Sequence, residues 1–177
     1  MSRLVVFAVG CLAALVIVAT ATATQLRTGT IEPWERVRGT LVVQHTPERA
    51  DMALFGYYCE PDITTSAVVR RTCRDVPRTK RLFVGYGMWD SKTAIAKAWN
   101  KSEWSMWIDG QPVSLDRFGT TDRTLYKYPA AGGKDVTLRE WSVVLSQPSP
   151  GRHTIRYRFR LPPQGVVDAT WTFRVQG

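Results

Sequence analysis

The sequence has few of the residues from which catalytic and metal sites are built. Only two of its 177 residues are histidine, His45 and His153, and three are cysteine. Neither histidine lies in a recognisable nucleophile or zinc motif. Asp109, Asp116 and Asp122 are close in the chain but do not have the spacing of a calcium loop. We therefore expect no enzymatic activity, no metal and no cofactor.

Long hydrophobic runs are missing except at the N-terminus. A short positive start, Met1-Ser2-Arg3, precedes an apolar run over residues 4–18 and small residues over 19–23. This pattern predicts a secretory signal peptide over residues 1–23. The alternative is an uncleaved membrane anchor, because the run approaches the ~20 residues that span a bilayer. We expect a secreted or cell-envelope protein that touches a membrane only if this segment stays uncleaved.

Two cysteines, Cys59 and Cys73, remain after the predicted signal peptide. In an oxidising compartment they are expected to form one disulfide. It would close a loop of about 15 residues and stabilise the fold by ~3 kcal/mol in the chain-entropy model. A metal site is poorly supported, because no further cysteine and no nearby histidine completes a ligand set. Arginine outnumbers lysine and Asn100 is the only asparagine, a composition that suggests a bacterial source.

The pair Asp109-Gly110 is the strongest short-range structural signal. A type I′ turn needs positive φ at both central residues, and Asp-Gly is among the pairs that supply it. The pattern predicts a hairpin whose large apolar side chains share one face, because a one-residue slip would move them all to the other. The expected partners are Ile108 with Gln111, Met106 with Val113, and Trp104 with Leu115.

Side chains alternate between apolar and polar over residues 153–161 and 169–175. This period of two indicates strands with one buried and one wet face. Short strands at such spacing, with turn signals between them, favour a β-sandwich. A helix over 91–101, capped by Ser91 or Thr93, is the one exception. Other strands are expected at 40–44, 52–58, 67–70, 82–86 and 136–145, with a lead-in over 24–37, a single domain over 38–177 and a long connection over 118–133.

The run Ser149-Pro150-Gly151-Arg152-His153-Thr154-Ile155-Arg156-Tyr157, with Trp171-Thr172-Phe173-Arg174-Val175, resembles the closing strands of bacterial secreted immunoglobulin-like and fibronectin-III-like domains. In these domains a Pro-Gly-x-His-Thr turn opens the penultimate strand. The resemblance covers residues 83–177 and implies an all-β, immunoglobulin-like antiparallel β-sandwich. It carries over no functional residues. Cys59 and Cys73 do not sit where the inter-sheet disulfide of antibody domains would be.

The most prominent candidate surface is a row of arginines on one predicted strand. Arg156, Arg158 and Arg160 occupy alternate positions about 6.5–7 Å apart, and Arg174 is expected to join them from the neighbouring strand. Guanidinium groups at regular spacing could bind phosphates or carboxylates. The alternative is a solvated outer face whose arginines pair with Asp or Glu of an adjacent strand.

A second basic cluster surrounds Cys73. Its density of positive charge suits an anionic partner, and outside the cell an envelope polymer or lipid head groups are likelier ligands than nucleic acid. The alternative is a mobile basic loop, held by the disulfide, that has no specific ligand. The residues of this cluster are Arg70, Arg71, Arg74, Arg78, Lys80 and Arg81.

The composition and these clusters together favour an exported, non-enzymatic binding module of the cell envelope. The net charge of +9 supports an anionic ligand, bound through the arginines. Two alternatives remain open. The first is a structural or protein-interaction domain, with another envelope protein as its partner. The second is a carbohydrate-binding module that uses Trp107, unless that side chain is buried beneath the helix.

Overall fold

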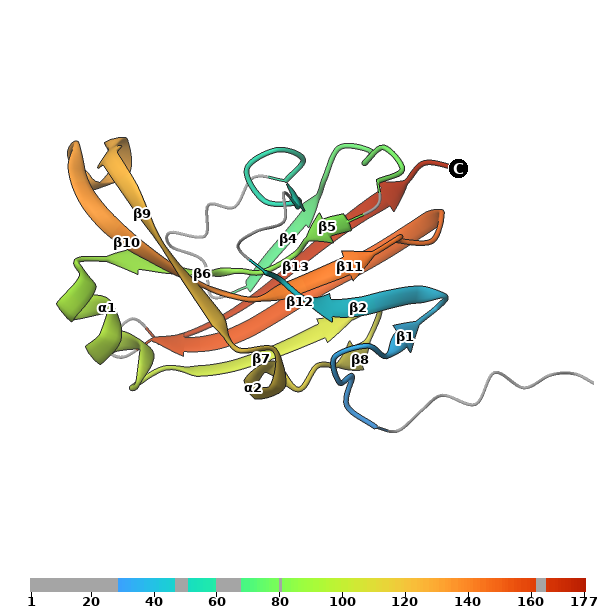
Figure 1. The fold of residues 1–177 in the computed structure, drawn as a ribbon, viewed down its shortest axis with the longest axis horizontal. Helices are drawn as coiled ribbons and strands as arrows, with labels where there is room; N and C mark the ends of the chain where they lie inside the picture. Colours follow the sequence, from blue (N-terminus) through green and yellow to red (C-terminus); the bar gives the residue numbers. More distant parts are fainter. Residues whose placement is uncertain (1–28, 47–50, 60–67, 80, 162–164) are drawn as a thin grey trace, which may run out of the picture.

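The computed structural model describes residues 29–46, 51–59, 68–79, 81–161 and 165–177, which form three β-sheets (Figure 1). The predicted signal peptide and Lys80 lie outside these ranges. The first sheet has the order β1 (Arg36–Val37), β2 (Thr40–Gln44), β11 (Val143–Ser146), β5 (Arg81–Phe83), β3 (Met52–Ala53). The second has the order β4 (Val68–Thr72), β13 (Gly165–Val175), β12 (Gly151–Leu161), β7 (Glu103–Ile108), β8 (Gln111–Pro112).

The third sheet is smaller and has the order β6 (Gly87–Asp90), β10 (Lys134–Trp141), β9 (Thr120–Tyr128). The hairpin of β9 and β10 projects from the body of the molecule (Figure 1). The helical segments are α1 (Lys92–Trp99), α2 (Leu115–Phe118) and the 3-10 turn η1 (Pro129–Ala131). None of the helices in the described ranges is long and apolar enough to cross a membrane.

One hydrophobic core joins the two five-stranded sheets. Tyr157 and Trp171 of the second sheet and Leu82 and Leu145 of the first are all fully buried within it. The hydroxyl of Tyr157 donates to the carbonyl oxygen of Val84 at 3.1 Å, which satisfies the one polar atom of this buried ring. The prediction of an all-β fold is therefore confirmed, and the arrangement is consistent with a β-sandwich.

Several local predictions are also confirmed. Asp109 and Gly110 have φ of 50° and 83°, and they connect β7 to β8. The alternation along β12 buries Ile155 and Tyr157 and leaves Arg158 exposed. The helix begins after Ser91, whose hydroxyl accepts from the backbone N–H of Ala94 at 3.3 Å. Cys59 and Cys73 form the predicted disulfide.

Other predictions were wrong in instructive ways. Strand β8 ends at Pro112, so Leu115 does not pair with Trp104 but begins α2. The expected connection over 118–133 contains the nine-residue strand β9. The expected strand 136–145 is two strands, because the chain passes at Ser142 from the small sheet to a large one. In the described part of 52–58, only Met52–Ala53 is a strand.

Candidate functional site

The arginine row on β12 faces away from the core, but its members differ in how far they are neutralised. Arg156 donates through Nε to Oδ1 of Asp168 at 2.9 Å and through Nη2 to Oδ2 at 2.5 Å. These hydrogen bonds hold the pKa of Asp168 below its ordinary value. Arg160 lies 3.8 Å from Glu103. Arg158 lies opposite Asp168 in the register, and its charge helps to lower the pKa of that carboxyl, but no ion pair within 4 Å includes Arg158 in the described ranges. The row therefore offers less free charge than its sequence suggests.

Arg174 does not extend the row in the way we expected. It pairs in register with Arg152, at the end of β12 that is distant from Arg158 and Arg160. Both Arg152 and Arg174 are exposed, and they line a shallow cavity of about 530 Å³ together with Thr72 and Cys73. Arg152 is a member of this surface that the predicted row did not include, although it has the same outward parity on β12 as Arg156.

Three arginines of the second basic cluster line one cavity of about 590 Å³. We call it the arginine cavity, and its other lining comes from the loop that precedes the disulfide. Strand β4 positions Arg70 and Arg71 by pairing in parallel with β13, where Arg70 lies opposite Thr170. The residues that line the arginine cavity are Gly56, Tyr57, Tyr58, Cys59, Arg70, Arg71, Thr72 and Arg74.

The loop and strand that form the arginine cavity are fastened at three points. The disulfide joins Cys59 to Cys73 across a Cα–Cα distance of 4.5 Å. The backbone N–H of Arg74 donates to the carbonyl oxygen of Tyr58 at 3.0 Å. The Arg74 guanidinium also donates to the carbonyl oxygen of Tyr57. The lining groups are thus held together by covalent and backbone contacts rather than by opposite charges.

The charge in the arginine cavity is only partly compensated. Arg70 is 57% exposed and shares Asp168 with Arg156, at a looser distance of 3.4 Å. Arg71 is exposed, and no ion pair within the described part of the chain includes it. Arg74 donates to a neutral carbonyl oxygen. All charged residues that the structure places in this lining are arginines, and the carboxylate with which an incoming anion would compete is Asp168, which lies outside the lining and pairs with Arg70.

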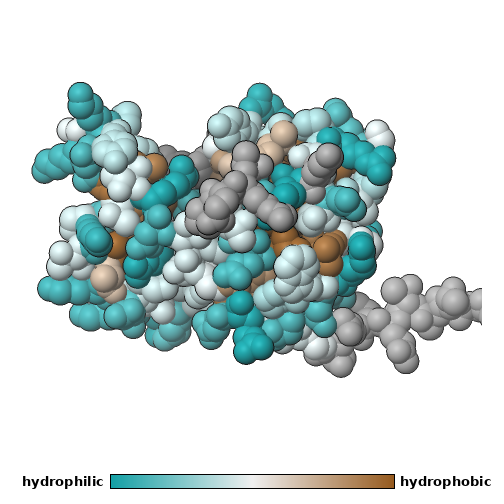
Figure 2. All heavy atoms as spheres, in the orientation of Figure 1, coloured by the Kyte–Doolittle hydropathy of each residue, from teal (hydrophilic) through white to brown (hydrophobic). Residues whose placement is uncertain are grey.

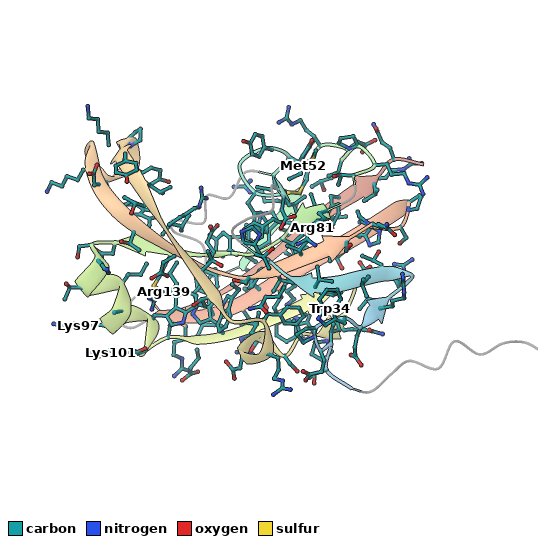
Figure 3. The ribbon with its side chains drawn as sticks, viewed as in Figure 1. Trp34, Met52, Arg81, Lys97, Lys101 and Arg139 are labelled. Atoms are coloured by element: carbon teal, nitrogen blue, oxygen red, sulfur yellow. A yellow bond between two sulfur atoms is a disulfide. The ribbon has the colours of Figure 1, made fainter. Side chains whose placement is uncertain are left out.

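The remaining members of the second cluster do not lie in the arginine cavity. Arg78 is exposed but does not line it. Arg81, labelled in Figure 3, belongs to β5, and its side chain is only 17% exposed. It forms an ion pair with the buried carboxylate of Asp51. Burial raises the pKa of Asp51, but hydrogen bonds from Arg81 and His45 outweigh it and lower the pKa overall. Arg81 lies outside the arginine cavity and its charge is paired with Asp51, so its role in ligand binding stays a prediction that this geometry does not favour.

Trp107 is half-buried on the outer face of β7, not beneath α1. It lies opposite Pro112 across the hairpin, and the guanidinium of Arg156 sits 4.6 Å from the centre of its ring. This cation–π contact covers one face of the indole. Trp107 also borders a separate cavity at the edge of β7.

The face of the molecule seen in Figure 2 is mainly hydrophilic. Figure 2 shows one face of the molecule, on which polar side chains surround small apolar patches. Within the described ranges, no three His, Cys, Asp or Glu side chains are grouped so that they could hold a metal ion. The arrangement is suited to binding a charged or polar ligand at the surface.

Comparisons with known proteins give no family for this chain. No protein family and no curated protein matches it. Among solved structures, it is similar to a cysteine protease inhibitor from Entamoeba histolytica, with 12% sequence identity and a TM-score of 0.32. The match covers 62% of this chain and 96% of the inhibitor. A similarity of this size supports neither a fold assignment nor a function.

Proposed function

We propose that the protein is a non-enzymatic binding module that holds an anionic ligand in the arginine cavity. The observation that carries this proposal is the gathering of Arg70, Arg71 and Arg74 around one cavity of about 590 Å³. A planar guanidinium binds phosphate or carboxylate through two parallel hydrogen bonds. Arg152 and Arg174 extend the positive surface on the neighbouring strands.

We also propose that the protein acts in the cell envelope of a bacterium. The disulfide fits an extracellular protein. The signal-peptide pattern over residues 1–23 supports export. An anionic envelope polymer or the head groups of a lipid surface is then the ligand that suits a net charge of +9.

For the fold we propose the immunoglobulin-like class of β-sandwich. Two five-stranded sheets around one core support this assignment, as does the long antiparallel pair β12–β13 at the end of the chain. Loops and edges of such sandwiches commonly carry the binding residues, and here the arginine cavity lies at the β4 edge of its sheet.

The decisive experiment compares two triple variants that remove the same charge. Arg70→Ala, Arg71→Ala and Arg74→Ala empty the arginine cavity of its cations. Lys92→Ala, Lys97→Ala and Lys101→Ala remove three exposed cations at helix α1, on which Figure 3 labels Lys97 (Lys101 follows it). The probes are inorganic polyphosphate, polygalacturonate, and vesicles of phosphatidylglycerol mixed with phosphatidylcholine.

We expect the cavity variant to bind the preferred probe about tenfold more weakly or worse, and the helix variant to change it far less. Hydrogen bonds to charged groups contribute about 1.5–3 kcal/mol, and 1.4 kcal/mol is tenfold in affinity. Equal weakening by both variants would mean that net charge, not this cavity, attracts the probe. Circular dichroism of each variant verifies that the fold is retained.

Ionic strength separates this proposal from an apolar protein-interaction face. Binding between exposed charges is screened over about 8–10 Å at ordinary salt, so the affinity for a polyanion should fall steeply as salt rises. If the affinity is unchanged by salt, the anionic-ligand proposal is wrong and an apolar interaction face is favoured.

A further inference from the structure

A second cavity, of about 570 Å³, lies along the part of β7 that β8 does not cover. We call it the β7 groove. It is separate from the arginine cavity, with which it shares no lining residue. The residues that line the β7 groove are Trp99, Ser102, Glu103, Trp104, Ser105, Met106, Trp107, Pro112, Val113, Ser114, Leu115, Asp116 and Trp141.

The backbone of Trp104 faces this groove with both its polar groups available. The backbone N–H of Asp109 donates to β12, so residues at odd positions of β7 direct their polar groups toward β12. Residues at even positions therefore direct their backbone N–H and carbonyl groups away from β12, toward the β8 side. In agreement with this, the carbonyl oxygen of Met106 accepts from the backbone N–H of Val113 at 2.9 Å. Beyond this bond β8 has ended, and the described residues give the N–H and carbonyl of Trp104 no backbone partner.

The neighbouring positions are partly occupied, so in the described part of β7 Trp104 is the residue that keeps both an N–H and a carbonyl open to the groove, next to the open N–H of Met106. The backbone N–H of Ser102 donates to the carbonyl oxygen of Trp99 at 3.0 Å, and the carbonyl of Met106 is bound to Val113. An added peptide strand would need pairs at successive alternate residues. The donor and acceptor that lie together on Trp104 suit one amide group of a ligand instead.

Aromatic rings surround this amide position. Trp99 and Trp104 stack with their centres 5.1 Å apart at an interplanar angle of 25°, and both are half-buried. Trp107 borders the same groove on the outer face of β7. The ring of Trp104 is stacked between Trp99 and Phe159, whose centre is 4.7 Å away, so Trp107 is the indole whose free face, opposite Arg156, can meet a ligand. A flat apolar surface of this kind fits the face of a pyranose ring, whose C–H groups are apolar while its rim carries hydroxyls.

Polar groups complete the rim of the groove. The side chain of Glu103 is 75% exposed, and Asp116 is also exposed. Ser105 contributes a hydroxyl from the same face of β7 as Glu103, whereas the hydroxyl of Ser114 already donates to Glu32 at 2.7 Å. Carboxylates accept hydrogen bonds and hydroxyls both donate and accept, which matches the hydroxyls of a sugar.

We propose that the β7 groove binds an N-acetylated amino sugar within an oligosaccharide. The acetamido group pairs with the N–H and carbonyl of Trp104, and the sugar ring lies against the indole of Trp107. Its hydroxyls donate to the carboxylates of Glu103 and Asp116. The groove volume lies within the 300–1,000 Å³ that small-ligand sites occupy.

The test uses two sugars that differ in the acetamido group. Tri-N-acetylchitotriose and cellotriose have the same β-1,4 linkage, but only the first carries acetamides. We expect calorimetric titration to show at least about tenfold tighter binding of the acetylated sugar, since one satisfied polar pair is worth roughly 1–1.5 kcal/mol. In NMR spectra, the backbone amide signal of Trp104 should be among those that shift most.

Matched variants locate the site. Glu103→Gln with Asp116→Asn keeps the shape of the rim and should weaken chitotriose binding about tenfold. Trp34→Phe alters an indole that is 71% exposed and does not line the groove, and it should leave chitotriose binding unchanged. The triple arginine variant should also leave it unchanged, so this inference can fail or succeed independently of the anionic-ligand proposal.

Three results would overturn the inference. Equal affinity for cellotriose would mean that no acetamido group is recognised. Absence of binding by either sugar at millimolar concentration would exclude a sugar site in the groove. Tighter binding of an acetylated extended peptide, with the same Trp104 shift, would assign the β7 edge to a protein partner.

Discussion

Two ion pairs on the same sheet place similar charges in very different surroundings. Asp109 and His153 are 2% and 3% exposed, whereas Asp168 and Arg156 are 18% and 41% exposed. Both pairs are formed by residues of β12 with a carboxylate from a neighbouring segment. The buried pair can only support the fold, while the exposed pair sets how much charge the surface offers a ligand.

The geometry of the buried pair fixes its protonation state. Nδ1 of His153 lies 2.8 Å from Oδ2 of Asp109, and Nε2 lies 2.8 Å from the carbonyl oxygen of Ser149. Both neighbours are acceptors, so both ring nitrogens must donate, and the ring is an imidazolium. Burial lowers the pKa of His153, but the hydrogen bonds that its ring donates to Asp109 and Ser149 outweigh it and raise the pKa overall.

The largest effect is expected from Asp109→Ala. This change leaves a buried imidazolium without its carboxylate, and it removes the acceptor of the Thr154 backbone N–H at 2.7 Å. Breaking a buried pair by removing one partner costs about 3–5 kcal/mol. Urea denaturation measures the loss, with Asp75→Ala as a control because Asp75 is exposed. A loss below about 1 kcal/mol would show that the pair contributes no more than an exposed one.

A smaller effect is expected from pH. Because the folded-state pKa of His153 is raised above its ordinary value of 6.5, the pair stabilises fully below that value. This contribution is lost as the pH rises through the raised pKa. The free energy of unfolding of the natural protein should therefore fall over this interval relative to that of His153→Gln. A difference that stays constant or grows with pH would contradict the imidazolium assignment.

Part of the buried pair of Asp109 and His153 could be predicted from the sequence, because strand alternation and turn formation depend on neighbouring residues in the chain. The alternation on β12 places His153 inward and Arg158 outward, and Asp109-Gly110 predicts its own turn. What no local pattern shows is that Asp109 meets His153 across 44 residues of chain. The pairing of β7 with β12 brings them together.

The strands of the projecting sheet were not predictable in the same way. Residues 120–124 of β9 are all polar and show no alternation. They form a strand because β10 pairs with them, aided by hydrogen bonds of 2.7 Å from Arg139 to Asp122. The two sheets that part at Ser142 likewise depend on contacts from distant segments, such as its 2.7 Å hydrogen bond with Thr121.

In the candidate sites, too, the sequence predicts single residues but not the contacts between distant segments. Charge density identified Arg70, Arg71 and Arg74, but nothing in the sequence indicated that Tyr57 would face them. The disulfide and the carbonyl contacts of Arg74 assemble that lining from two segments. The β7 groove exists because β8 ends at Pro112, a boundary that the hairpin pattern did not predict.

The smallest stability effect, and the most informative for function, is expected from Asp168→Asn. Exposed ion pairs contribute about 0–1 kcal/mol, so the free energy of unfolding should change by no more than this. The same change frees Arg156 and Arg70 from their shared carboxylate and should tighten binding of the preferred polyanion severalfold. Asp122→Asn is the matched control, because it removes the same charge from the pair with Arg139 on the projecting sheet. If both variants tighten binding equally, the gain reflects net charge; if only Asp168→Asn does, this carboxylate limits the basic surface that spans β4, β13 and β12.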